Sequence, residues 1–144
     1  MDIKRIVIKG ASGYGPLNEA YEDKLTMTSD SISYEYKPHP ESKCDTNIYK
    51  KWRYKTTSPL FKELYHQVSG MLPKYLYSED ILFATDIGST EITAIFEDGH
   101  REKTNYCCPS EYFAEWFRVI KQMVPACEYT PAVLLTNEDY EQEE

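Results

Sequence analysis

Long apolar runs are missing from this 144-residue chain. None approaches the length of about 20 residues that a membrane-spanning helix needs. An export signal is missing too, because residues 1–9 are too short and too charged to form the apolar core of a signal peptide. These two absences predict a cytoplasmic protein that does not enter a membrane.

The residue spacings that usually mark a metal site are also absent. The cysteines (Cys44, Cys107, Cys108 and Cys127) form no CxxC pair, and the histidines (His39, His66 and His100) form no HxxxH pair. Without an export signal, the cysteines are predicted to be reduced thiols. The glycines of residues 10–15 match neither GxGxxG nor a loop ending in GK[ST], so this segment is predicted to be a plain loop. We therefore predict no metal and no cofactor.

The sequence offers two possible catalytic arrangements. Cys108 precedes a predicted helix N-terminus, where the helix dipole lowers the pKa of a thiol, and His100 lies on the same predicted hairpin. A second arrangement would pair carboxylates as acid and base. Its candidates are Asp86, Glu91, Glu97 and Asp98. No flanking signature supports either one, and turn chemistry and solvent exposure account for the acids. No catalytic residue is predicted.

The negative charge is concentrated at the C-terminus. Of the net charge of −8, five units belong to residues 138–144, which leaves −3 for the remainder. Short acidic segments of this kind are usually solvated and disordered. We therefore predict one domain over residues 1–137 followed by a disordered acidic tail. The overall acidity argues against non-specific binding to nucleic acid or to an anionic membrane.

Alternating apolar and polar residues recur along the chain, and this pattern predicts half-buried strands. The predicted strands are residues 3–9, 24–28, 32–36, 51–56, 81–87, 92–96, 100–106 and 132–135. Asp98-Gly99 is a strong signal for a two-residue hairpin. The chain therefore predicts an α+β fold with antiparallel sheet.

Two amphipathic helices interrupt the strands. Ser58-Pro59 reads as a helix N-cap followed by proline at the first helical position, and Pro73 is predicted to end this helix. A second helix is predicted between Pro109-Ser110 and Pro125. Apolar residues recur at helical spacing in both segments.

The two helices match each other at an offset of 52 residues. Ser58, Phe61 and Pro73 correspond to Ser110, Phe113 and Pro125. Each helix also follows three predicted strands, so we predict two βββα units, residues 24–73 and 80–125. Such units could join into one larger antiparallel sheet or pack as two layers, with helices covering one side and the other face exposed or partly covered as a binding platform.

The segment around Trp52 suggests where a partner would bind. Lys51, Arg53 and Lys55 alternate with aromatic residues, and Tyr36 lies on a neighbouring predicted strand. Tyrosine and arginine are enriched at protein interfaces. We predict a non-enzymatic module that binds another protein, or forms a homodimer, through these four residues. Two alternatives remain open: a small enzyme with a pocket between the repeats, and a weak binder of single-stranded nucleic acid.

Overall fold

The computed structural model describes residues 2–12, 20–43, 47–76, 89–106, 110–126, 128 and 130–136. Its elements are β1 (Ile3–Ala11), β2 (Tyr21–Met27), β3 (Ser31–Pro38), β4 (Lys50–Lys55), α1 (Pro59–Leu76), β5 (Ser89–Phe96), β6 (Arg101–Tyr106), the 3-10 turn η2 (Ser110–Phe113), α2 (Ala114–Lys121) and the 3-10 turn η3 (Ala132–Leu134). The predicted α+β class is confirmed.

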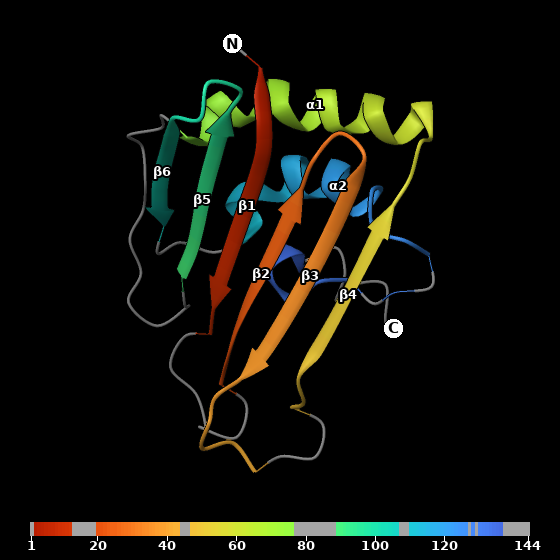
Figure 1. Ribbon diagram of the computed structural model, residues 1–144. Coiled ribbons are helices and arrows are strands. Elements are labelled where there is room, and N and C mark those ends of the chain that lie inside the picture. Colours follow the sequence, from red (N-terminus) through yellow and green to blue (C-terminus); the bar gives the residue numbers. More distant parts are fainter. Residues whose placement is uncertain are drawn as a thin grey trace.

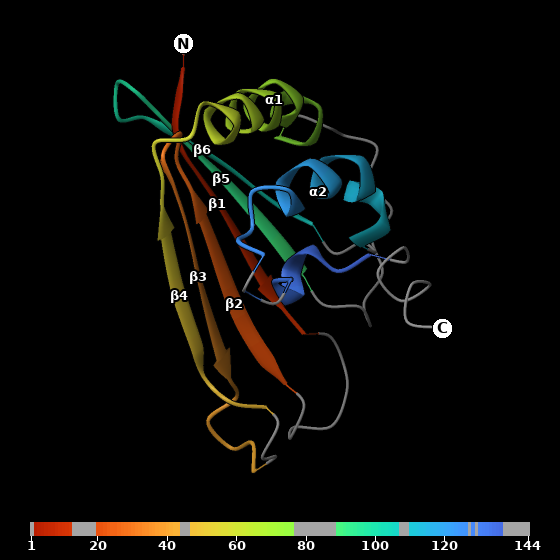
Figure 2. The same cartoon turned by 90° about the vertical axis from the view of Figure 1, so that its right-hand side faces the viewer.

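The strands form one six-stranded antiparallel sheet in the order β4-β3-β2-β1-β5-β6. Strand β1 lies at the centre and pairs with β2 on one side and β5 on the other (Figure 1). The side view shows α1, α2 and η3 on the same side of the sheet (Figure 2). The opposite side carries no helix among the described residues, as Figure 2 also shows.

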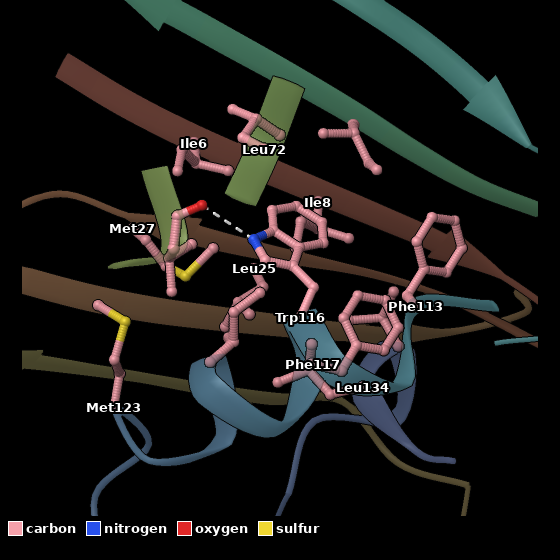
Figure 3. Packing of buried hydrophobic residues seen from close by; sticks show 14 of the residues in the cluster. Ile6, Ile8, Leu25, Met27, Leu72, Phe113, Trp116, Phe117, Met123 and Leu134 are labelled. Carbon is pink, nitrogen blue, oxygen red and sulfur yellow. Dashed lines mark hydrogen bonds between the residues drawn. The ribbon is translucent and has the colours of Figure 1, made fainter. Parts of the chain in front are cut away.

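The core lies between the sheet and this layer of helices. On the central strands, Ile6, Ile8 and Leu25 are fully buried because alternate side chains point toward the helices. The large buried side chains that meet them from the helices include Trp116 and Phe117 (Figure 3). The strands predicted at residues 3–9 and 24–28 are confirmed as β1 and β2, with somewhat different ends.

Helix α1 begins as predicted but ends later. Ser58 Oγ accepts a hydrogen bond from the Phe61 amide, at 3.5 Å, which is the N-cap interaction. The predicted end at Pro73 is wrong, because the helix continues to Leu76. Proline forfeits one helical hydrogen bond. Burial compensates, since Tyr75 and Leu76 beyond the proline pack into the core and Tyr75 stacks on Trp116 at 5.2 Å.

Helix α2 is joined to α1 by a buried hydrogen bond. The indole Nε1 of Trp116 donates to the carbonyl oxygen of Val68 at 3.0 Å (Figure 3). A buried indole usually needs such a partner, because an unpaired polar group is costly in an apolar environment. The bond fixes how the two helices pack above the sheet.

A hairpin is present at Asp98-Gly99, but the predicted two-residue loop is wrong, because the Phe96 amide donates to the His100 carbonyl oxygen and leaves residues 97–99 in the loop. It joins β5 to β6, and Gly99 has φ = +92°, a conformation that L-residues with side chains rarely adopt. The predicted strand over residues 132–135 is wrong, because residues Ala132–Leu134 form the 3-10 turn η3. The amides of Ala132 and Val133 bond to side chains of the sheet instead of a neighbouring strand.

The tandem βββα repeat is not confirmed. The structure describes two strands, β5 and β6, before α2, and the strand predicted over residues 81–87 lies outside the described residues. The two helices also differ in length, with 18 residues in α1 and 8 in α2. Their matched apolar positions have a simpler physical cause, since both helices bury one side on the same sheet.

Candidate binding surface

The face of the sheet opposite the helices is the main candidate for a functional surface, and we call it the open face. It consists of the strand side chains that alternate with the core residues and point away from α1 and α2. Figure 1 looks directly onto it. Most of these side chains are exposed or half-buried, so the face is accessible across its width.

Basic side chains dominate the open face. They are Arg5, Lys9, Lys24, Lys37, Lys51, Arg53, Lys55, Arg101 and Lys103. The acidic side chains there are Glu22, Glu35 and Glu91. The face therefore carries a net charge of +6 and holds nine of the sixteen lysines and arginines. Because the whole chain carries −8, the rest of the sequence carries −14.

Aromatic side chains are almost absent from this surface. No strand residue on the open face is aromatic, because Tyr34, Trp52 and Tyr54 point to the helix side together with Ile32. Tyr49, just before β4, reaches this face, where its hydroxyl donates to Glu35 Oε2 at 2.6 Å. The face therefore lacks the succession of stacking rings that typically holds single-stranded nucleic acid.

Both edge strands carry basic side chains. Lys51, Arg53 and Lys55 lie on β4, and Arg101 and Lys103 lie on β6. Lysine-rich edges discourage the pairing of a further strand. The face of the sheet is therefore a better candidate for binding than its edges.

A shallow groove of about 400 Å³ lies on the open face. Its lining includes three lysines, four acidic residues and two neutral polar residues: Lys9, Lys24 and Lys37, then Glu22, Asp23, Glu35 and Glu91, and finally Ser89 and Asn105. A smaller hollow, of about 160 Å³, adjoins it and shares Lys24 and Glu35. The lining is mostly charged and polar, so the groove suits a charged ligand better than an apolar one.

The groove carboxylate Glu35 is held in its ionised form. The hydrogen bond from Tyr49 is the main cause that lowers the pKa of Glu35, and Lys37 adds to it at 3.4 Å. The same bond raises the pKa of the Tyr49 hydroxyl. Because a good general base has a pKa near the working pH, a carboxylate with a lowered pKa is a weak candidate for acid–base catalysis.

A buried polar cluster lies on the helix side of β2. Asp23 Oδ2 accepts hydrogen bonds from the Tyr34 hydroxyl, at 2.7 Å, and from the Val133 amide, at 2.9 Å. The Tyr34 oxygen in turn accepts from the Ala132 amide at 3.2 Å. Burial raises the pKa of Asp23, and burial together with the neighbouring carboxylate raises that of Tyr34. The cluster fastens η3 to the sheet.

The structure separates the four residues predicted to form an interaction surface. Lys51, Arg53 and Lys55 share the open face. Tyr36 lies on the helix side, where it stacks on Tyr21 with ring centroids 5.0 Å apart. Its hydroxyl donates to Asn47 Oδ1. Tyr36 therefore does not share a surface with the three basic residues.

The catalytic candidates are only partly placed. Asp98 caps the hairpin by accepting from the His100 amide, and its Oδ1 also contacts the imidazole Nδ1. The backbone hydrogen bond from His100 is the main cause of the lowered pKa of Asp98. Glu91 pairs with Lys103 and Glu97 is exposed. Asp86, the four cysteines, the predicted tail at 138–144 and residues 13–15 of the predicted loop lie outside the described residues. The loop prediction is wrong at Gly10 and Ala11, which belong to strand β1.

Within the described ranges, no three or more histidine, cysteine or acidic side chains gather in a way that would hold a metal ion. No helix of that same part of the chain is long and apolar enough to cross a membrane.

The comparisons with known proteins add no family. No model of a protein family matches this chain, and no curated protein is significantly similar to it in sequence.

The basic residues of the central strands, chief among them Lys9 and Lys24, were not among the residues predicted from the sequence to form a surface. These two residues lie in separate alternating segments, and each segment alone reads as an ordinary solvated strand. They become neighbours only through the pairing of β1 with β2. The signal that could have found them is the shared polarity of the outward positions in every predicted strand.

Proposed function

We propose that this protein is a non-enzymatic binding module that recognises an acidic surface on another protein through its open face. The proposal rests on the uneven distribution of charge between the open face and the rest of the chain. The open face has a net charge of +6 in a chain whose total is −8. A field of one sign over an accessible face attracts a surface of the opposite sign and speeds association.

Three further observations support an acidic protein as the partner. Single-stranded nucleic acid is disfavoured because the strand residues of the open face include no aromatic side chain on which bases could stack. The basic edge strands argue against a partner that adds a strand to the sheet. Glutamates placed among the lysines, such as Glu35 and Glu91, would add selectivity by repelling acidic surfaces whose charges fall in the wrong places.

Charge reversal on the open face tests the proposal. The variant Lys51→Glu/Arg53→Glu reverses two charges on this face, and the matched control Lys62→Glu/Lys74→Glu makes the same change in net charge on helix α1. The probe is a fluorescent polyglutamate peptide whose binding to the full chain is followed by anisotropy at low and high salt. We expect the first variant to weaken binding about tenfold at low salt and the control to change it little.

Equal loss in both variants would mean that net charge alone governs binding, and this result would overturn the proposal. The same titration with oligothymidylate tests the nucleic-acid alternative. Binding to oligothymidylate that is tighter than to polyglutamate, and lost in the open-face variant, would replace the proposed partner with single-stranded nucleic acid.

A further inference from the structure

One row of side chains crosses the whole open face and contains an unusual charge pattern. In order from β4 to β6, the paired residues are Lys51, Glu35, Lys24, Lys9, Glu91 and Asn105. Charges of opposite sign alternate along this row except at its centre, where two lysines are direct neighbours. This centre is the pairing of β1 with β2, the red and orange strands in the middle of Figure 1.

The juxtaposition of Lys9 and Lys24 is unfavourable in the free protein. Side chains directly opposite each other on neighbouring antiparallel strands have Cβ atoms about 4.5–5.5 Å apart, and like charges at such positions repel. A sheet built for stability alone would place an opposite charge or a neutral residue at one of the two positions.

The carboxylates directly opposite the two lysines are engaged elsewhere, whereas Glu22, two positions from Lys24 on the same face, lines the groove beside them. Glu91, the other cross-strand neighbour of Lys9, forms an ion pair with Lys103 at 2.5 Å. Glu35, the other neighbour of Lys24, accepts from Tyr49 and pairs with Lys37. Neither Lys9 nor Lys24 takes part in a salt bridge with any residue in the described part of the chain.

The groove provides room for a ligand beside both lysines. It has a volume of about 400 Å³, and Ser89 and Asn105 supply neutral polar groups in its lining. This volume is within the range of small-molecule sites, about 300–1,000 Å³. An ammonium group is a compact point charge with three donors, which suits one oxygen of an anion without demanding the flat, two-pronged geometry of an arginine fork.

We propose that Lys9 and Lys24 together bind a single oxyanion group, a carboxylate or a phosphate, and that this site anchors an acidic side chain of the protein partner. An anion between the two lysines restores alternating charge along the row. The role as an anchor rests on the proposed function, whereas the oxyanion site itself does not.

Inorganic phosphate is the first probe. In the full chain, NMR signals of the lysine side chains are followed during a phosphate titration. Lys9 and Lys24 should shift together and saturate, while Lys55, on the same face but outside the groove, should not. Shifts of similar size at all lysines, without saturation, would indicate an adventitious ion only and would overturn the proposal.

Variants that neutralise one charge each sharpen this test. Lys9→Gln and Lys24→Gln should each weaken phosphate binding roughly tenfold, the size of one lost hydrogen bond to a charged group. The matched control Lys55→Gln should leave it unchanged. Unaltered phosphate binding in either groove variant would remove that lysine from the site and overturn the pairing.

Peptides separate the two oxyanions and separate this proposal from the proposed function. A glutamate peptide and the same peptide with one phosphoserine distinguish carboxylate from phosphate. The preferred oxyanion is the one whose peptide binds the wild type more tightly and loses more affinity in Lys9→Gln. If polyglutamate binding depends on Lys51 and Arg53 but not on Lys9 and Lys24, the two central lysines do not anchor the partner. The proposed function as a module that binds an acidic protein is then still supported. If phosphate saturates the groove but polyglutamate does not bind to the open face, the proposed function is overturned and the oxyanion site is supported.

Discussion

The hydroxyl of Tyr34 donates a hydrogen bond of 2.7 Å to Asp23 Oδ2 across the pairing of β3 with β2, and both residues are buried. The same carboxylate oxygen holds the Val133 amide, and Tyr34 holds the Ala132 amide. Two side chains of the sheet thus supply acceptors to the backbone of a turn that has no strand partner.

Removing one member of this cluster should destabilise the protein. Tyr34→Phe leaves a buried carboxylate without its hydroxyl donor and the Ala132 amide without its acceptor. We expect the free energy of unfolding to fall by about 1–3 kcal/mol, measured by urea denaturation. The control Tyr54→Phe removes a hydroxyl from an exposed tyrosine and should cost less than about 0.5 kcal/mol. Equal losses would contradict the role assigned to the cluster.

Asp23 should make stability depend on pH. Burial raises its pKa in the folded protein above the unfolded value, so the folded state binds the proton more tightly. Its contribution to stability is therefore fully present below the unfolded pKa of about 4 and is lost as pH rises through the folded pKa. Asp23→Asn removes this titration while keeping an acceptor oxygen.

The measurement compares the free energy of unfolding of wild type and Asp23→Asn between about pH 4 and pH 7. The stability of the wild type relative to the variant should decrease as pH rises. A relative increase with pH would mean that the hydrogen bonds lower the pKa of Asp23 more than burial raises it.

Alanine substitutions at two glycines should change the free energy of unfolding in opposite directions. A Cβ atom added at Gly10 would lie 2.5 Å from Asp23 Oδ1 and 2.9 Å from Val133 Cγ2, so Gly10→Ala must displace the buried cluster. We expect a loss of about 1–3 kcal/mol. At Gly70, within α1, an added Cβ meets nothing within 4 Å, and Gly70→Ala should stabilise by about 0.5–1 kcal/mol. Thermal or urea unfolding of both variants checks the signs.

The repulsion between Lys9 and Lys24 should also appear in stability. Lys9→Gln removes one of two like charges on neighbouring strands, so the free energy of unfolding should rise by about 0.2–1 kcal/mol at low salt and the gain should shrink at high salt. Lys103→Gln, which instead breaks the ion pair with Glu91, should give no gain. A loss of stability in Lys9→Gln would show that Lys9 is already neutralised in the free protein.

Much of the fold could be predicted from local patterns. Alternation located the strands around Ile6, Tyr34 and Ile92, and the Ser58 cap located the start of α1. Errors arose where tertiary contacts outweigh local signals. Pro73 does not end its helix because Tyr75 beyond it is buried, and residues 132–135 form no strand because the sheet holds their amides with side chains.

The candidate surface was predictable only within single strands. The basic face of β4 follows from the alternation of Lys51, Arg53 and Lys55 with aromatic residues. That same alternation assigns Tyr36 to the core side, together with Ile32. The excess of positive charge and the groove depend on which strands are neighbours, and pairing between distant segments is not encoded in any one of them.

The central position of β1 has a consequence for how the chain folds during synthesis. Strands β1 to β4 pair in sequence order and can form a meander as soon as they leave the ribosome. The other edge of β1, however, pairs with β5. Ile8 therefore has no cross-strand partner on that side until Ile92 has been synthesised. Until then a central strand with three buried apolar residues, Ile6, Val7 and Ile8, presents an unpaired edge, which is the condition under which nascent chains aggregate or recruit chaperones.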